Sequence, residues 1–297
     1  LMCAEMRIIM NKRTVNISSL VLLLSLLSLI TTMCLYYIVP MHYVSVIFAA
    51  AASVLLAHFF LESSLNYDYN FLHAASMTVT TLIFAIVIYL IQPNEWITFD
   101  FWLPCLVLIN WLVPFLYCTL RDLFDRGPRF DGYHKFFNRM CIFFTFIYIF
   151  VIIKQYFIAP IVPPYHKLAF GAHNFVPFMA TADYIEQTLK AGKPLYDFIL
   201  YAAELICLGI PFGYMIRVAL RKLNFVFRII IYILFPAALE FIQYYTNLGR
   251  ADIDDCVFSI IGILIGVILF HIMNAAFQTI AARDFMISRA QQKKYHF

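Results

Sequence analysis

Residues 256–273 read CVFSIIGILIGVILFHIM, a run that contains no Asp, Glu, Lys or Arg. A helix needs about 20 mostly apolar residues to cross a hydrocarbon layer of roughly 30 Å, and this run with its flanks is long enough. Other runs of the same kind recur along the chain, which is 63% apolar and only 13% charged. The composition therefore predicts an integral membrane protein and excludes a soluble globular domain.

The apolar runs predict eight transmembrane helices. None of the runs keeps a period-two alternation of apolar and polar residues, which argues against a β-barrel. The expected fold class is all-α, a polytopic membrane helical bundle. The expected spans are Ile17–Val39, Tyr43–Leu61, Ala74–Ile91, Phe101–Leu120, Met140–Ala159, Ile199–Ile216, Phe227–Tyr245 and Cys256–Met273.

The distribution of Lys and Arg predicts the orientation of these spans. Four segments, residues 7–13, 121–139, 217–228 and 283–294, hold 16 of the 21 basic residues. Eight crossings place all four segments on one side, and the positive-inside bias makes that side the cytoplasm. Both termini are therefore expected to be cytoplasmic. The loop Glu62–His73 is the weak point, because it is expected on the same side but has no Lys or Arg.

A domain organisation follows from the spans and from one predicted break between them, the Gly-Pro pair at residues 127–128. Residues 1–125 are expected to form an N-terminal four-helix region of unknown role, and residues 126–139 a cytoplasmic linker. Residues 140–276 are expected to form a second four-helix domain with an outward loop at 160–198. Residues 277–297 are expected to form a basic cytoplasmic tail.

Two glutamates lie within predicted spans of the second half, Glu204 and Glu240, and Gln243 follows Glu240 on the same helical face. A carboxylate in a span costs roughly 2.5–3.5 kcal/mol on insertion scales unless it faces protein, a cavity or a partner charge. Both glutamates fall about five residues from the outward end of their helices, so they could meet. The alternative is that these side chains are hydrogen-bonding contacts between buried helices.

A charged cluster, Arg250, Asp252, Asp254 and Asp255, precedes the last span. In one interpretation Asp252 caps the helix, the other acids favour its positive end and Arg250 balances them. In the other, the carboxylates bind a ligand or a divalent cation, the cofactor that this acidic cluster could take, while Arg250 holds an anionic group. The spacing does not choose between these interpretations.

The outward loop from Pro160 to Asp197 is too long for a simple connection, so it is expected to be functional or partly helical. It contains Asn174 at the start of the sequence NFVPF, residues 174–178. We expect this segment to form a lid over the polar residues. The alternative is an aromatic segment that lies in the membrane interface, where rings are enriched.

These residues carry a resemblance to a known family. NFVPF (174–178), IPFG (210–213), EFIQ (240–243), GRADIDD (249–255) and the pair Gly262 and Gly266, in this order, resemble the motifs of the VanZ-like family of bacterial integral membrane proteins. The resemblance covers about residues 140–273. The family usually has an asparagine where this chain has Ser259. The resemblance implies a multi-pass protein of the bacterial cytoplasmic membrane, and the family's namesake is associated with low-level teicoplanin resistance.

Three functional hypotheses follow. The first is an outward-facing site of Asn174, Glu204, Glu240, Gln243, Arg250, Asp252, Asp254 and Asp255 that binds a lipid headgroup, a peptidoglycan precursor or a glycopeptide. The second is a membrane enzyme acting on a lipid-linked phosphate or sugar. The third is a proton-coupled transporter of lipids or small molecules that uses Glu204 and Glu240. Membrane lipids are expected partners, and a net charge of +4 is too small to indicate a nucleic acid.

Overall fold

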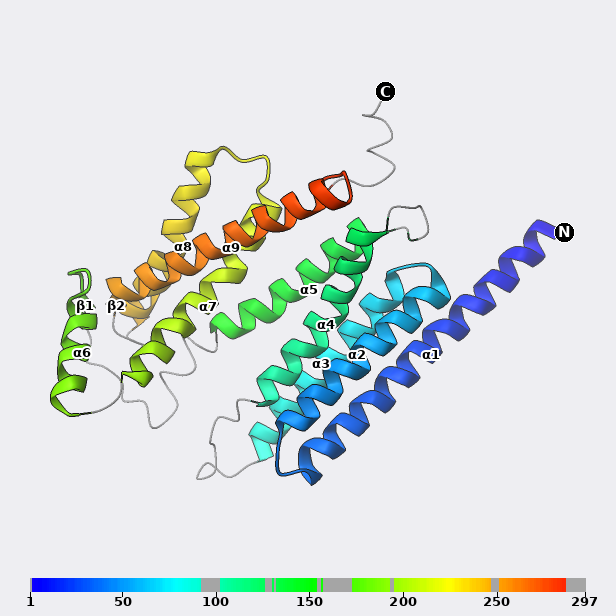
Figure 1. Ribbon diagram of the computed structural model, residues 1–297, viewed down its shortest axis with the longest axis horizontal. Coiled ribbons are helices and arrows are strands. Elements are labelled where there is room, and N and C mark those ends of the chain that lie inside the picture. Colours follow the sequence, from blue (N-terminus) through cyan, green and yellow to red (C-terminus); the bar gives the residue numbers. More distant parts are fainter. Residues whose placement is uncertain are drawn as a thin grey trace. The chain divides into compact units, whose positions relative to one another are not determined.

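The computed structural model describes residues 2–91, 102–125, 130, 132–153, 156, 173–192, 195–246 and 251–286. Within these ranges the chain forms nine helices and two short strands (Figure 1). Their bounds are α1 Met2–Ile38, α2 Tyr43–Ser64, α3 Asp68–Ile91, α4 Trp102–Phe124, α5 Tyr133–Ile153, β1 His173–Asn174, α6 Met179–Lys190, α7 Tyr196–Ala219, α8 Phe225–Thr246, β2 Ala251–Asp252 and α9 Ile253–Ile280.

Eight of the described helices are long and apolar enough to cross a membrane. They correspond one to one with the eight predicted spans, so the predicted all-α, polytopic fold is confirmed. The remaining described helix, α6, lies in the long loop between α5 and α7. The expectation that this loop is partly helical is therefore also confirmed.

The chain divides into two compact units. The first unit comprises Leu1–Phe143 together with Ala276–Phe297, and the second comprises Phe144–Ala275. Both boundaries fall inside helices, because α5 begins in the first unit and continues into the second, whereas α9 does the reverse. The predicted linker at residues 126–139 therefore includes the first turns of α5, whose aromatic side chains Phe136 and Phe137 are fully buried.

Helices α1 to α4 form the body of the first unit. Within it α2 and α3 each pack against α1 and α4 and against one another, and Figure 1 shows the four helices side by side. One part of the core contains Met33 and Tyr36 of α1, Ala49 of α2 and Leu106 of α4. Apolar packing of this kind explains why these helices assemble but does not account for the polar residues that they also bury.

Ion pairs join the two helix connections at one end of the first unit. The Arg121 guanidinium lies 2.8 Å from the Glu62 carboxylate, and the Arg139 guanidinium lies 2.7 Å from the Asp68 carboxylate. The turn between α2 and α3 therefore lies beside the end of α4 and the start of α5. This contact explains how the loop at Glu62–His73 can share a side with a basic segment although it has no Lys or Arg of its own.

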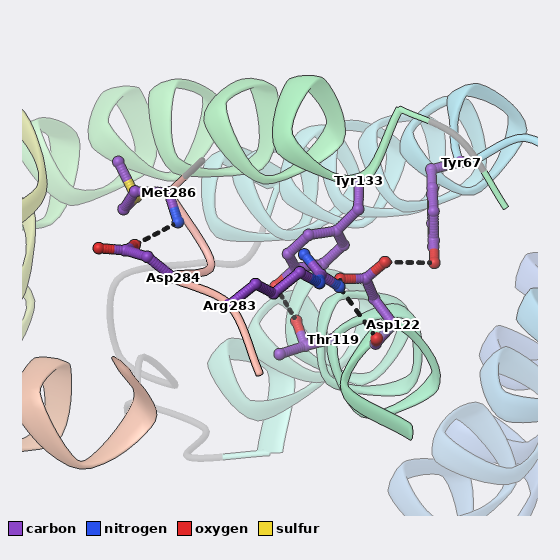
Figure 2. Close-up of polar contacts among 7 residues, drawn as sticks. All are labelled: Tyr67, Thr119, Asp122, Tyr133, Arg283, Asp284 and Met286. Carbon is purple, nitrogen blue, oxygen red and sulfur yellow. Dashed lines mark hydrogen bonds and ion pairs between the residues drawn. The ribbon is translucent and has the colours of Figure 1, made fainter. Parts of the chain in front are cut away.

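The residues after α9 are held at the same end of the first unit. Arg283 donates to the carboxylate of Asp122 in α4, and Tyr67 donates to the other oxygen of that carboxylate at 3.3 Å (Figure 2). The Asp122 side chain is fully buried and that of Arg283 is 7% exposed. The Arg283 guanidinium also lies over the ring of Phe277, 5.3 Å from its centroid. A buried ion pair thus fixes the chain where the basic tail begins.

In the second unit, α7 and α9 cross with their backbones in contact. A Cβ atom added at Gly213 of α7 would lie 2.0 Å from the carbonyl oxygen of Ile263, and one added at Gly262 of α9 would lie 2.0 Å from the carbonyl oxygen of Ile206. Gly209 and Gly266 are enclosed in the same way. Two small-residue faces, one on each helix, therefore interlock. Gly262 and Gly266 thus form a packing face for α7, as small residues spaced four apart commonly do in membrane helices.

Helices α5 and α8 complete the core of the second unit. Tyr148 and Ile152 of α5 pack with Leu239 of α8, and the Tyr148 hydroxyl donates to the carbonyl oxygen of Leu208 in α7 at 2.8 Å. Helix α5 begins at Tyr133, seven residues before the predicted span. The reason is that its first turns are amphipathic, with aromatic residues that pack in the first unit and charged residues between them.

Candidate functional site

A two-residue parallel sheet brings the long loop to the start of α9. His173 pairs with Ala251 and Asn174 pairs with Asp252, at the end of the second unit where α6 also lies (Figure 1). Residues about 78 positions apart in the chain therefore become neighbours. The sheet places the predicted lid beside the predicted acidic cluster.

Asp252 has a central position in the hydrogen bonds of this region. Its Oδ1 atom accepts from the side-chain amide of Asn174 at 2.9 Å and from the backbone N–H of Asp254 at 3.0 Å. The second bond is the usual bond of an N-cap residue to the exposed N–H groups of a first helical turn. The side chain is 6% exposed. The capping interpretation of Asp252 is thus realised, and the same oxygen also fastens the lid.

The side chain of Glu240, on α8, contacts the backbone of Asp252. Its Oε2 atom accepts the backbone N–H of Asp252 at 3.0 Å, and the residue is only 6% exposed. The Glu240 carboxylate therefore lies beside the backbone of Asp252, and both residues are shielded from bulk solvent. Buried carboxylates favour nearby hydrogen-bond donors or a positive charge, because burial disfavours a charge that has no partner.

Asp254 acts on a different helix from its own. Its Oδ1 atom accepts the N–H of Phe178 at 2.5 Å, and its Oδ2 atom accepts both the N–H and the hydroxyl of Thr181, at 3.0 and 2.8 Å. Helix α6 has no cap from its own N-cap residue, Phe178, which adopts a left-handed conformation with φ of 63°. Asp254 therefore caps α6 from the start of α9 and uses both of its oxygens within the chain.

Gln243 and Asp255 make contacts at the edges of the group. The Gln243 side chain donates to the carbonyl oxygen of Tyr156 at 3.0 Å, and Asp255 accepts a hydrogen bond from the hydroxyl of Tyr201. Tyr156 is 5% exposed, and its burial raises the pKa of its phenol above the ordinary value. This hydroxyl therefore remains a neutral hydrogen-bonding group at physiological pH.

The structure gathers six of the eight predicted site residues into one group, which we call the polar cluster. Its members are Asn174, Glu240, Gln243, Asp252, Asp254 and Asp255. Of the other two, Glu204 lies on α7 with an exposed side chain, and Arg250 lies outside the described residues. The polar cluster joins the lid, α6, α8 and α9 within the second unit.

The polar cluster combines buried carboxylates with exposed apolar side chains. Directly after Asn174, the side chains of Phe175 and Val176 are 64% and 56% exposed, and that of Phe178 is 55% exposed. Within the described parts of the chain, no three His, Cys, Asp or Glu side chains are placed to hold a metal ion. The arrangement is thus amphipathic, with acidic oxygens inside and apolar groups beside them.

Sequence reasoning did not identify Thr181, Tyr201 or Tyr156 as members of this region. Their contacts depend on how the loop and α7 pack, and the only sequence signal was a threonine at the start of a short amphipathic segment. It also did not single out Asp122 and Arg283, which pair across the first unit (Figure 2). An acidic residue beside a basic linker looks like part of a solvated charged loop until its burial is known.

A comparison with protein families identifies the region that contains this site. Residues 140–274 match the family model described as VanZ/LLP1. No curated protein and no solved structure matches the chain. The matched range covers most of α5, all of β1, α6, α7, α8 and β2, and most of α9, and it contains every member of the polar cluster.

Proposed function

We propose that the polar cluster of this multi-pass membrane protein, which lies in the region that matches the VanZ/LLP1 family model, binds the headgroup of an amphipathic ligand at the extracytoplasmic surface. The ligand is a membrane lipid or a lipid-linked cell-wall precursor. Binding of such a ligand would connect the protein to glycopeptide tolerance, the property with which the namesake of the VanZ-like family is associated.

One observation carries this proposal. The buried carboxylate of Asp252 accepts a hydrogen bond from Asn174, and the two side chains that follow Asn174 in the chain, Phe175 and Val176, are apolar and exposed. The buried carboxylate of Glu240 accepts the backbone N–H of the same aspartate. A headgroup with ammonium, hydroxyl or amide donors complements the carboxylates. The acyl or prenyl chains of the same molecule complement the apolar side chains. A ligand of purely polar character would leave the apolar part of this surface unused.

Arg250 gives the proposed site its positive charge. In the sequence it comes directly before β2, two residues before Asp252. A guanidinium binds a phosphate with two parallel hydrogen bonds. We therefore assign the phosphate of the headgroup to Arg250 and its donor groups to Glu240 and Asp252.

The enzyme hypothesis in its metal-assisted form would require a group of metal-binding side chains, and the described residues do not include such a group. The transporter hypothesis paired Glu204 with Glu240. These two side chains differ in environment, because Glu204 is exposed and Glu240 is buried. A binding site is therefore the function that the geometry supports best.

The test is teicoplanin tolerance in a bacterial host that expresses the chain, compared for Glu240→Gln, Arg250→Ala and the unchanged protein. We expect both substitutions to abolish any tolerance that the chain confers, because each removes a charge that holds the headgroup. Glu186→Gln is the matched control, since Glu186 is an exposed acid on α6 that pairs with Lys190 on the surface. Membrane levels and melting temperature of each variant must equal those of the parent.

A binding measurement addresses the ligand directly. Purified protein in nanodiscs that contain phosphatidylethanolamine should retain this lipid in native mass spectrometry more than it retains phosphatidylcholine, because an ammonium group donates hydrogen bonds and a trimethylammonium does not. Glu240→Gln should remove the difference. Equal retention of both lipids by the parent, together with unchanged tolerance in both site variants, would reject the proposed function.

A further inference from the structure

Polar side chains are buried where α1, α2 and α3 of the first unit meet. The centre of this group is a 2.7 Å hydrogen bond between the Ser25 hydroxyl of α1 and the Nδ1 atom of His73 in α3. Ser25 is 2% exposed and His73 is fully buried. Nearby, the side-chain amide of Asn70 donates to the carbonyl oxygen of Ala57 in α2 at 3.2 Å.

Four buried polar atoms in this region form no hydrogen bond with any described part of the chain. They are Ser28 Oγ of α1, Ser53 Oγ of α2, and Asn70 Oδ1 and His73 Nε2 of α3. The residues are at most 9% exposed, and three of the four are fully buried. The Nε2 atom of His73 lacks a hydrogen bond in either tautomer of the ring. Nδ1 already bonds Ser25, so Nε2 is left with either an unused N–H or an unused lone pair.

Helical geometry places each of these four atoms on, or about one turn from, a residue that joins two of the helices by a hydrogen bond. Ser28 follows Ser25 by three residues, and Asn70 precedes His73 by three, so each pair lies on one helix face about 4.5 Å apart along the axis. Ser53 precedes Ala57 by four residues on α2, about 6 Å along the axis. The two cross-helix bonds, Ser25 to His73 and Asn70 to Ala57, fix the three helices beside one another.

The surroundings make these atoms costly to leave unpaired. All four belong to helices that are candidate membrane spans, and lipid offers no hydrogen bonds to compensate for a buried polar group. Natural proteins pair nearly all buried polar atoms with protein groups or ordered water. A cluster of four such atoms on three packed helices therefore indicates a ligand that lies between them.

The chemistry of the residues defines the ligand. Residues 17–38, 43–61 and 69–91 contain no Asp, Glu, Lys or Arg, so the group offers no charge to an ionic ligand. It presents two hydroxyls, an amide oxygen that only accepts, and an imidazole nitrogen. A ligand that satisfies all four atoms must be small, uncharged and able both to donate and to accept. We propose that ordered water molecules bind among Ser28, Ser53, Asn70 and His73 and form a hydrated polar site inside the N-terminal helices.

A direct test is solid-state NMR on the full chain in lipid bilayers with ¹⁵N-labelled histidine. Magnetisation transferred from water should reach the Nε2 atom of His73 as efficiently as it reaches the ring of the exposed His271. The His73 signals are those missing from His73→Gln. Absence of transfer to His73, with normal transfer to His271, would overturn the proposal.

A second test uses Ser28→Ala and Ser53→Ala, which do not require histidine assignment. If water bridges the two hydroxyls, each substitution should lower the melting temperature, and the double substitution should lower it by less than the sum. If the site is dry, removal of an unpaired hydroxyl should raise the melting temperature or leave it unchanged, and this result, or strict additivity, would contradict bound water.

The matched control is Ser45→Ala. Ser45 is a fully buried serine on α2 whose hydroxyl donates to the carbonyl oxygen of His42 at 2.6 Å, so its bond is complete within the chain. The change in melting temperature caused by Ser45→Ala should add to the change caused by Ser28→Ala. Coupling between Ser45 and Ser28 as large as that between Ser53 and Ser28 would mean that the coupling reflects general repacking, and the proposal would fail.

Discussion

Asp252 and Asp254 are two residues apart, yet their carboxylates have different roles. Asp254 uses both oxygens to hold the start of α6, through Phe178 and Thr181. Asp252 caps its own helix and binds the lid through Asn174. The helix N-terminus favours both acids, because its unpaired N–H groups and its dipole attract negative charge. Of the two, Asp254 is therefore mainly structural, whereas Asp252 remains part of the proposed ligand site.

Asp122 and Arg283 form an ion pair that is enclosed within the first unit. Both side chains are almost completely enclosed, and Tyr67 also donates to the carboxylate (Figure 2). Removal of one partner from a buried pair leaves an uncompensated charge, which typically costs about 3–5 kcal/mol, whereas replacement of both partners by apolar residues costs far less. The stability of the first unit should therefore depend on the two residues together.

We predict that Asp122→Ala lowers the free energy of unfolding by about 3–5 kcal/mol, because Arg283 is then buried without a counter-charge. The double variant Asp122→Leu with Arg283→Met should be more stable than Asp122→Ala. Thermal melting in detergent, followed by circular dichroism, checks both results. The exposed pair of Glu186 and Lys190 is the control, and Glu186→Ala should change stability by less than about 1 kcal/mol. A double variant less stable than Asp122→Ala would contradict this account.

At the scale of helices, α7 and α9 depend on glycine for their close approach. A Cβ atom at any of Gly209, Gly213, Gly262 or Gly266 would fall within 2.3 Å of a backbone atom of the other helix. Because the obstructing atoms are backbone, they cannot move aside as a flexible side chain can. The helices must separate if a side chain is added, and the polar cluster at the start of α9 would shift with them.

We predict that Gly262→Ala lowers the free energy of unfolding of the second unit by at least about 1–3 kcal/mol, the usual cost of overpacking a core. The loss should appear as a lower melting temperature and as faster hydrogen exchange in α7 and α9. Ile261→Ala is the neighbouring control, because Ile261 is 40% exposed on α9. Equal effects of the two substitutions would show that the glycine contact is not what holds these helices together.

At the scale of the whole chain, contacts between helix ends group these ends by the side of the membrane that they face. The bonds of Glu62 with Arg121 and of Asp68 with Arg139 put the α2–α3 turn on the same side as the basic segment after α4. The pair of Arg283 and Asp122 adds the end of α9 to that side. These contacts agree with an even number of crossings, and the positive-inside bias predicts that the shared side is cytoplasmic.

We predict that a membrane-impermeant maleimide labels Val176→Cys in intact cells and labels Ser63→Cys only after the membrane is permeabilised. Both positions are exposed, Val176 in the lid and Ser63 at the end of α2. The parent chain measures the background from native cysteines. The reverse pattern would invert the orientation and place the polar cluster in the cytoplasm, and identical labelling of both positions would contradict the number of crossings.

The sequence by itself determined the membrane class, the eight helices and the position of the VanZ-like region. These features are local, because hydropathy along about 20 residues decides a span and short motifs in order decide the family resemblance. It also predicted that Asn174 and the acids before α9 belong together. Glu204 and Glu240 could not be judged in this way, since helix periodicity fixes a face but not the neighbour that the face meets.

Only the tertiary structure decided how the polar groups are used. The partners of Asp254 on α6 lie more than 70 residues away in the sequence, and Asp122 and Arg283 lie 161 residues apart. Whether a carboxylate caps a helix, pairs with an arginine or is placed to bind a ligand depends on which segments pack beside it. That choice is made by helix packing and burial, because a hydrogen bond requires a donor within about 3 Å, and no local pattern of residues specifies that distance across a fold.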